Sequence, residues 1–502
     1  MSRTAVADDP VRSRKATQSR IAKRRRNAEL SLILMVGAVT AAAYTIAALG
    51  TNSEIPPGIV VFVLVILGLL MGAHLAVRLF ARGADATLLP LAAYLHGIGF
   101  VMITRLDDDL AGLQALWSFV AVGAFIGTLV FVQRVVNLDH RTWWWFAGGA
   151  FLLLLPLAPG IGRLINGARI WVSIGPVNFQ PGEFAKLALA IFFASYLAER
   201  RELIAASTWK VGPFHLPEPR FIAPILFAWG FAVVVMVAER DLGSSLLFFS
   251  LFVVMMWVAT ERAMYLVLGV IMFSGAAWFA WSRFSHVRTR VDIWLDPWSR
   301  SLDEGYQIVQ SLYGLSDGGL LGTGLGRGNP NQVPEAQNDF IFASIAEEMG
   351  LLGAATILMA FLLMVGAGLR TAIRTERPFE KLLAVGLTTI VGVQAFIIIA
   401  GVIKIVPLTG ITLPFVSYGG SSLVANYILL ALLVRISDSA ARRLGEVPDT
   451  PTTGELWQAR RLNARIRRAE KKGKPLPEFA DVDADILVQH ERPTDIDLDH
   501  LP

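Results

Sequence analysis

The feature that most constrains this chain is its series of apolar segments, each about as long as a membrane-spanning helix. About twelve can be distinguished, and most are close to the ~20 residues that a helix needs to cross ~30 Å of hydrocarbon. They cover residues 29–50, 57–81, 86–104, 113–133, 142–158, 180–198, 220–238, 242–260, 263–282, 340–369, 379–402 and 421–437. The fifth is short and the tenth is long, which leaves the count open. Because 54% of the residues are hydrophobic and 17% are charged, the pattern predicts an all-α polytopic membrane protein.

Basic residues predict the orientation in the membrane. Lys and Arg cluster before the first apolar segment and again after the last one, and such clusters favour the cytoplasmic side. Twelve crossings would place both ends of the chain there. The first apolar run, about 21 residues, exceeds the 7–15-residue core of a signal peptide, so a retained helix is expected. The net charge of +5 comes largely from these tails, which lie next to anionic lipids, so membrane lipids are expected partners and nucleic acid is not.

Three stretches lie outside the apolar segments. Residues 1–28 are predicted to be a disordered, basic cytoplasmic tail, and residues 438–502 a largely disordered cytoplasmic tail that follows the membrane domain at 29–437. In the second tail, residues 455–472 could lie on the inner leaflet or be a solvated segment. The chain has no cysteine, which excludes disulfides and thiolate metal sites.

The third stretch is the loop 283–338, predicted to lie outside the cell. It is far longer than a median connection of ~4–6 residues, and loops of that size are usually functional or disordered. Its aromatic residues, among them Trp294 and Trp298, predict that it is ordered. Residues 301–315 have the spacing of a surface helix with one apolar face.

Asp339 is the first candidate for chemistry, because it stands at the start of the tenth apolar segment. An acid at the mouth of a membrane helix is costly unless it has a partner or a function. A straight helix from Asp339 to Leu369 would be about 45 Å long at ~1.5 Å per residue, which places Asp339 near the outer headgroups. Small residues at helical spacing would leave its carboxylate facing a groove; they are Ala343, Ala346, Gly350 and Gly353. The alternative, favoured by the local pattern alone, is that Asn338 or Asp339 caps the helix.

Two acids follow on the same segment. Glu347 and Glu348 are adjacent and therefore point about 100° apart, so they cannot both face the groove. A salt bridge to an intramembrane cation is the simplest role for them. The candidate partners are Lys186, Lys404 and Arg240.

Three further clusters carry polar or flexible residues. Glu183 and Lys186 are spaced i, i+3, so they can pair on one helix face, either as part of a site or as a structural ion pair. The glycine run 318–328 lacks the Lys-Ser/Thr of a phosphate loop. Two interpretations remain: it is a plain turn region, or its backbone approaches a pyrophosphate. Residues 407–422 contain prolines and glycines, so they predict a broken segment that lines the groove beside Asp339.

Six blocks of the sequence together resemble the SEDS family of cell-shape, division and sporulation proteins (RodA, FtsW and SpoVE). The blocks are IWVSIGPVNFQPGEFAK, RDLGSS, DIWLDPW, YQIVQSLYGLSDGGLLGTGLG, VPEAQNDFIFASIAEEMGLLG and LTGITLPFVSYGGSS. They span roughly 160–437, and two additional N-terminal helices at about 29–81 would precede a ten-helix core. The wording KIVPLTGITLPF and the added helices resemble the RodA branch found in actinobacteria. Gly182 and Arg240 depart from the serine and proline usual in the family, which bears on local packing only.

The resemblance implies a peptidoglycan glycosyltransferase of the bacterial cytoplasmic membrane. Such a protein polymerises lipid II on the outer face, beside a class B penicillin-binding protein that cross-links the product. Asp339 falls on the position of the essential acid of this family. Other positions that the family pattern makes important for substrate are Trp171, Glu183, Lys186 and Glu335. Ser417, in the broken segment, is a further candidate for substrate binding.

The expected reaction is attack of a sugar 4-hydroxyl on an anomeric carbon that carries a polyprenyl pyrophosphate. A carboxylate base would contribute ~10²–10⁴ in rate, and Asp339 is the candidate. The departing pyrophosphate needs positive charge, for which the candidates are Arg288, Arg290, Lys186 and Lys404. A divalent cation, Mg²⁺ or Mn²⁺, could also supply it, although no compact carboxylate cluster predicts a dedicated metal site. The alternatives are a lipid II flippase, a division-type polymerase and a non-catalytic scaffold.

Overall fold

The computed structural model describes most of the chain between residues 10 and 447. The described ranges are 10–53, 58–165, 168–174, 177–205, 209–211, 214–216 and 218–447. The segment 455–472 and nearly all of the predicted C-terminal tail lie outside them.

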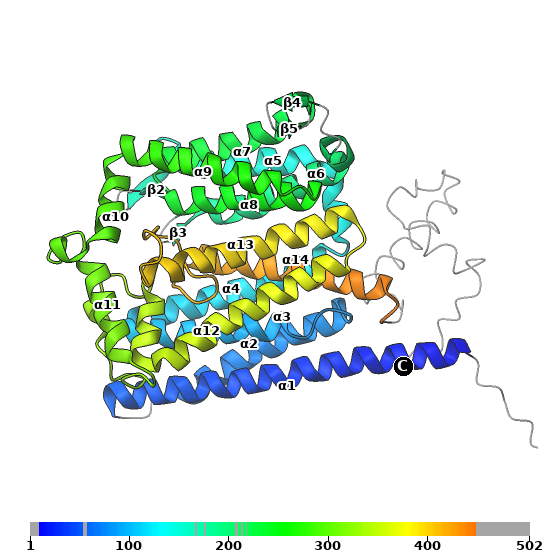
Figure 1. The fold of residues 1–502 in the computed structure, drawn as a ribbon. Helices are drawn as coiled ribbons and strands as arrows, with labels where there is room; N and C mark the ends of the chain where they lie inside the picture. The colour runs from blue at the N-terminus through cyan, green and yellow to red at the C-terminus, as the bar shows by residue number, and fades with distance from the viewer. Residues whose placement is uncertain are drawn as a thin grey trace, which may run out of the picture. The chain divides into compact units, whose positions relative to one another are not determined.

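Long helices make up the fold, and they lie side by side in Figure 1. The helices that correspond to the twelve apolar segments are α1 (Pro10–Asn52), α2 (Ile59–Phe80), α3 (Leu88–Leu106), α4 (Asp109–Phe131), α5 (Thr142–Leu154), α6 (Pro181–Ala205), α7 (Pro219–Glu239), α8 (Leu242–Thr260), α9 (Met264–Arg283), α12 (Ile341–Arg374), α13 (Pro378–Val402) and α14 (Gly420–Arg443). Eleven helices of the described part are long and apolar enough to cross a membrane. The exception is α5, which has 13 residues and continues into the short helix η2 (Leu155–Leu157). The chain is therefore a polytopic, helical membrane protein, as predicted.

Shorter elements connect these helices. They are the helices η1 (Val135–Arg141), α10 (Ser285–Leu295), η3 (Trp298–Arg300), α11 (Tyr306–Gly318) and η4 (Pro330–Gln332), and the strands β1 (Gly162–Ile165), β2 (Ala168–Ile174), β3 (Val177–Phe179), β4 (Trp209–Val211) and β5 (Phe214–Leu216). The first three strands form a small antiparallel sheet in the order β1-β2-β3, and β4 pairs with β5. The loop 283–338 is ordered, as predicted, and its expected surface helix is α11. On α11, Ile308 is buried, and Leu312 and Leu315 pack against the hydrophobic core.

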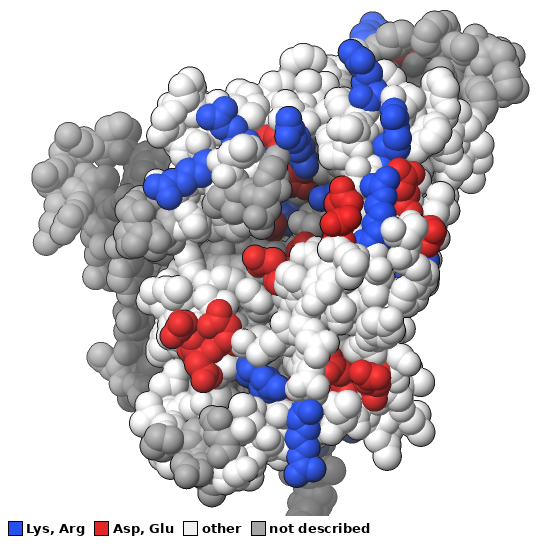
Figure 2. All heavy atoms as spheres, turned by 90° about the vertical axis from the view of Figure 1, so that its left-hand side faces the viewer, with Lys and Arg blue, Asp and Glu red and all other residues white. Residues whose placement is uncertain are grey.

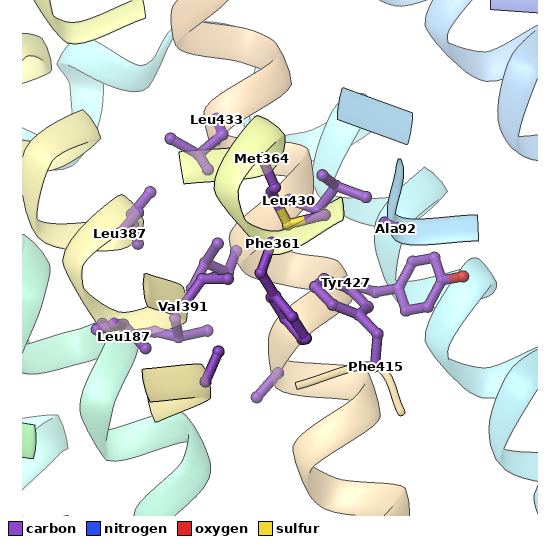
Figure 3. Packing of buried hydrophobic residues seen from close by; sticks show 14 of the residues in the cluster. Ala92, Leu187, Phe361, Met364, Leu387, Val391, Phe415, Tyr427, Leu430 and Leu433 are labelled. Atoms are coloured by element: carbon purple, nitrogen blue, oxygen red, sulfur yellow. The ribbon is translucent and has the colours of Figure 1, made fainter. Parts of the chain in front are cut away.

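The core lies where α12, α13 and α14 pack together. Figure 3 shows Phe361 and Met364 of α12 meeting Leu430 of α14, with Leu387 and Val391 of α13 beside them. By contrast, much of α9 and α2 remains exposed in the described structure. These exposed faces are apolar, as expected of helix surfaces that face lipid.

The N-terminal region differs from the prediction of a disordered tail. Helix α1 already begins at Pro10, so that prediction is wrong for residues 10–28. Arg26 pairs with Glu29 on the same helix and donates to the Ala84 carbonyl, and both side chains are buried. Glu29 also contacts His74 of α2 at 2.7 Å. The contacts with Ala84 and His74, which composition does not reveal, hold the end of the basic segment against the rest of the protein.

Helix α12 is not straight, contrary to the prediction. Gly350 has φ 67° and ψ −171°, which breaks the helix at that point. The glycine run 318–328 bridges the break: the Thr323 and Gly324 amides donate to the carbonyls of Glu347 and Glu348 at 2.9 and 3.0 Å. In return, two amides that follow the break, those of residues 351 and 352, donate to the carbonyls of residues 319 and 320 at 2.9 and 3.2 Å. The backbone groups freed by the break are therefore satisfied by the loop.

Candidate functional site

Charged side chains gather at one end of the helices, which we call the loop end. It carries α10, α11, the β1-β2-β3 sheet and the connection 403–419 (Figure 1). Figure 2 looks onto this end and shows acidic and basic side chains next to one another in its upper middle part. The candidate site is built there from segments that lie far apart in the sequence.

Asp339 lies at the loop end, directly before α12. The residue in the cap position is Phe340, and no side chain caps the helix, so the capping alternative is wrong. The backbone before Asp339 is fixed from the connection 403–419: Ser417 Oγ donates to the Asn338 carbonyl at 2.6 Å. The Tyr418 amide donates to the Gln337 carbonyl at 2.9 Å. Asp339 is thus positioned by the broken segment that was expected to lie beside it.

Arg290 of α10 lies close to Asp339 and supplies a positive charge. A Cβ atom at Gly410 would lie 3.5 Å from Asp339 Oδ2 and 3.7 Å from Arg290 Nη2. Arg290 Nη1 also donates to the Leu408 carbonyl at 2.9 Å. Gly410 has φ +76°, a conformation that favours glycine. Helix α10, the connection 403–419 and the start of α12 therefore meet around one carboxylate and one guanidinium.

Burial and neighbouring charges tune the acid. Partial burial raises the pKa of Asp339 to about 6; Arg290 opposes this shift, and the like charge of Glu335 adds to it. Burial also lowers the pKa of Arg290, against the opposing effect of Asp339 and Asp241. A carboxylate with a pKa of about 6 is mostly ionised at neutral pH yet more basic than an ordinary aspartate. It has the property expected of a general base.

Asp241 joins the same group of charges, although the sequence did not single it out as a site residue. It is buried between α7 and α8 and accepts a bond from the Ser244 amide at 2.9 Å, which caps α8. Burial raises the pKa of Asp241, whereas Ser244 and Lys186 lower it. Gly243 next to it packs against Ile411 and Thr409. The signal in the sequence was the Asp-Leu-Gly-Ser order at a helix start.

Glu183 and Lys186 form a buried ion pair on α6, with Nζ and Oε2 2.8 Å apart. Lys186 also donates to Gln394 Oε1 of α13 at 3.0 Å. The amide nitrogen of Gln394 in turn donates to the Thr412 carbonyl at 2.7 Å. This chain of bonds ties α6 to the connection 403–419, which also holds Asp339. Gln394 lies within an apolar helix, and the sequence alone did not identify it.

The remaining predicted residues are not gathered at Asp339 to the same degree. Glu335 is exposed, has φ +56°, and accepts from Asn338 Nδ2 at 2.6 Å. Arg288 is exposed and donates to the Ser282 carbonyl at 3.0 Å; helical residues two apart point about 200° apart, which separates it from Arg290. Lys404 Nζ donates to the Leu295 carbonyl at 3.4 Å. Trp171 is partly buried on β2, opposite Arg163 in the sheet.

The glycine run holds carboxylates of the protein itself. The Asn329 amide donates to Glu347 Oε1 at 2.6 Å, and the Gly326 amide donates to Glu348 Oε2 at 2.9 Å. The cation that pairs with Glu348 is Arg105 of α3, at 3.2 Å. The expected partners Lys186, Lys404 and Arg240 were therefore wrong for Glu348. The Gly326 amide of the run and the Asn329 amide directly after it therefore hold the two acids of α12 in place.

Within the described ranges, no group of three or more His, Asp or Glu side chains could hold a metal ion.

Comparisons with known proteins agree with one another. Residues 86–442 match the model of the FtsW/RodA/SpoVE family, described as cell cycle proteins. "Peptidoglycan glycosyltransferase RodA" of Mycobacterium tuberculosis is 43% identical over 435 residues, which is 84% of this chain and 93% of that protein. "Stage V sporulation protein E" of Bacillus subtilis is 33% identical over 70% of this chain and 96% of its own. The fold is similar, with a TM-score of 0.61 and 26% identity, to a chain described under "Structural coordination of polymerization and crosslinking by a peptidoglycan synthase complex"; the match covers 71% of this chain and 98% of that one.

Proposed function

The chain belongs to the FtsW/RodA/SpoVE family, and from this premise we propose that it is a peptidoglycan glycosyltransferase of RodA type in which Asp339 acts as the general base. The proposed activity rests on a relative with this name, of whose length the match with this chain covers 93%. The assignment of Asp339 rests on one observation: a partly buried carboxylate with a pKa of about 6 lies beside Arg290 at the loop end.

In the proposed reaction, two lipid-linked disaccharides meet at the loop end. Asp339 accepts the proton of the sugar 4-hydroxyl of one substrate as its oxygen attacks the anomeric carbon of the other. The bond to the polyprenyl pyrophosphate breaks, and this group leaves with the electron pair. A single displacement converts an α-linked donor into a β-1,4 glycan. Positioned base catalysis of this kind contributes ~10²–10⁴ in rate.

Arg290 is the cation best placed to assist. Its guanidinium stabilises the ionised form of Asp339: against the larger effect of burial, the charge of Arg290 lowers the pKa of Asp339, and the charge of Asp339 raises the pKa of Arg290. Of the other candidate cations, Lys186 is engaged by Glu183 and Gln394. We assign Arg290 a direct electrostatic role and Lys186 the role of positioning the connection 403–419.

A divalent cation, Mg²⁺ or Mn²⁺, fits this arrangement if Asp339 and the substrate bind it together. Magnesium is usually held by one or two carboxylates together with substrate phosphates and water, and Asp339 offers one such carboxylate. The pyrophosphate would supply the remaining oxygens. When bound, the cation would neutralise the charge that develops on the leaving group.

The location of Asp339 favours chemistry over transport. A lipid flippase is expected to carry its acids near the middle of the membrane. Asp339 instead precedes α12, next to the connection between α13 and α14. We propose that the loop end faces outward and that both ends of the chain are cytoplasmic, in keeping with the basic residues around the first and last helices. A class B penicillin-binding protein is the proposed partner, since a similar chain belongs to a peptidoglycan synthase complex.

The direct test is polymerisation of labelled lipid II by the purified full-length protein, alone and with its transpeptidase. Glycan chains formed in either mixture support the proposal. Transfer of lipid II across vesicles without any polymer, in both mixtures, would contradict it in favour of a flippase.

A further inference from the structure

A cavity of about 460 Å³ lies among α1, α2, α3 and α4, with Tyr427 of α14 at its inner side. Helices α1 and α2 precede the residues that match the family model, which begin at 86. The cavity therefore exists only because these two helices pack against the family's core. It is separate from the candidate site, since none of the residues around Asp339 lines it.

The cavity has the length of one lipid leaflet. Its lining extends from Gly58 to Leu70 along α2 and from Ala111 to Val122 along α4. At ~1.5 Å per residue these stretches are about 16–18 Å long, roughly half of the ~30 Å hydrocarbon core. Both stretches start at the loop end. The cavity thus runs from that surface toward the middle of the membrane.

The side chains that line the cavity have few free hydrogen-bonding groups for water. His96 is bonded on both nitrogens, to Tyr427 Oη at 2.8 Å and to Ser118 Oγ at 2.9 Å. Ser118 in turn donates to the Gln114 carbonyl at 2.7 Å, so the polar groups at the inner end satisfy one another. Thr40 Oγ1 is the lining side-chain atom that is buried without a partner in the described structure. Because a bound water needs 2–4 polar partners, the cavity suits hydrocarbon instead.

An acidic stretch of chain lies beside the entrance. Asp107 and Asp108 connect α3 to α4, whose first residue is Asp109, and Asp108 is close enough to interact electrostatically with Tyr44, which lines the cavity. The nearby Arg105 is paired with Glu348. A headgroup that carries pyrophosphate would be repelled at this entrance, whereas an ammonium group would be attracted.

We propose that this cavity binds one acyl chain of an ammonium-headed phospholipid, such as phosphatidylethanolamine, with the headgroup beside the three aspartates. The bound lipid fills the space between the two added helices and the core. It is distinct from the polyprenyl substrate and takes no part in the reaction.

Photo-cross-linking of the full-length protein in nanodiscs tests this proposal. The probe is phosphatidylethanolamine with a diazirine in the middle of one acyl chain, and the labelled residues are located by mass spectrometry. We expect labels concentrated on cavity-lining positions that are not exposed on the outer surface, such as Val65, Ile66 and Ala115. Even labelling of all lipid-facing helices, without enrichment in the cavity, would overturn the proposal.

Two matched pairs of variants separate the cavity from the outer surface. Ala115→Phe fills the cavity, whereas Leu116→Phe changes the adjacent, exposed position on α4. Val65→Phe and Leu64→Phe are the equivalent pair on α2, and they keep the test valid if one filling variant fails to fold. Cavity labelling should fall to background in each filling variant and persist in each control. Labelling that persists in a folded filling variant would contradict the proposed site.

The headgroup is tested with two further probes that carry the same diazirine. Phosphatidylglycerol and a polyprenyl diphosphate should label the cavity less than phosphatidylethanolamine does. Stronger labelling by the diphosphate would show that the cavity serves the substrate's tail and would overturn the assignment. Equal labelling by both phospholipids would overturn the role of the aspartates. Neither result bears on lipid II polymerisation, which is assayed separately.

Discussion

The side chains of Arg290 and Asp339 both lie within 4 Å of the place that a Cβ atom at Gly410 would occupy. A Cβ atom at Gly410 would be 3.7 Å from Arg290 Nη2 and 3.5 Å from Asp339 Oδ2. The three residues come from α10, the connection 403–419 and the start of α12. Their meeting defines the candidate site, and its behaviour on mutation depends on these three residues and on the bonds that support them.

The first prediction concerns the charges around Asp339. Burial raises the pKa of Asp339; beyond that effect, Arg290 lowers it and Glu335 raises it. If the ionised carboxylate is the base, activity rises with pH through that pKa. Arg290→Gln should therefore move the acidic limb of the kcat/KM profile to higher pH, and Glu335→Gln should move it to lower pH. Shifts in the same direction, or none in either folded variant, would argue against Asp339 as the titrating base.

The second prediction concerns Gly410, whose φ of +76° strains any other residue. Gly410→Ala should cost roughly 1–2 kcal/mol of stability, and its methyl group should touch both Asp339 and Arg290. We expect Gly410→Ala to lose polymerisation activity at temperatures at which its melting curve shows that it is still folded. Gly230→Ala on α7 is the control, because a Cβ there meets nothing within 4 Å. Equal losses in both variants would contradict this interpretation.

The third prediction decides whether Glu183 and Lys186 stabilise the fold. Both are buried and paired at 2.8 Å. Removing one partner of such a pair typically costs ~3–5 kcal/mol, because a buried charge is left without compensation. Lys186→Met should thus lower the melting temperature in detergent strongly, and the double variant Glu183→Leu/Lys186→Met should recover part of the loss. A single variant with unchanged melting temperature would show that the pair is not structural.

The fourth prediction concerns the glycine run that bridges the break in α12. At Gly322, φ is +85° and a Cβ would lie 2.2 Å from the Glu348 carbonyl oxygen. Gly322→Ala should therefore destabilise the protein. Gly319→Ala is the matched control, since φ is also positive there, at +48°, but a Cβ meets nothing within 4 Å. The two variants should differ in folded yield by size-exclusion chromatography; equal yields would mean that the close approach is unimportant.

Much of the fold could be predicted from the sequence because a membrane helix is a local property. A run of about 20 apolar residues is sufficient to identify it, and each of the twelve predicted segments corresponds to a helix. Only α5 falls below the length needed to span. The helix start at Pro10 and the break at Gly350 were missed. The sequence does not show the distant contacts of either region: Arg26 of α1 donates to the Ala84 carbonyl, and the glycine run bridges the break in α12.

The site was predictable in part. Asp339 stood out because a charged residue beside an apolar helix is costly, and the resemblance to the family gave it a role. Pairing was harder to predict, because it is decided in three dimensions: Arg105 reaches Glu348 from α3, and Gln394 reaches Lys186 from α13. Asp241 was not predicted as a site residue because an aspartate at a helix start is explained by capping, which it does for α8. Its electrostatic interaction with Arg290 depends on the three-dimensional fold.

The central claim is that the carboxylate of Asp339 is the base. Its most direct test compares wild-type protein and Asp339→Asn in polymerisation of purified lipid II, with thermal stability and transpeptidase binding measured in parallel. Asparagine keeps the shape of the side chain but cannot accept the proton. We predict that polymerisation falls by about 10²–10⁴, while stability and partner binding are retained. A folded Asp339→Asn protein that polymerises lipid II at the wild-type rate would contradict the assignment.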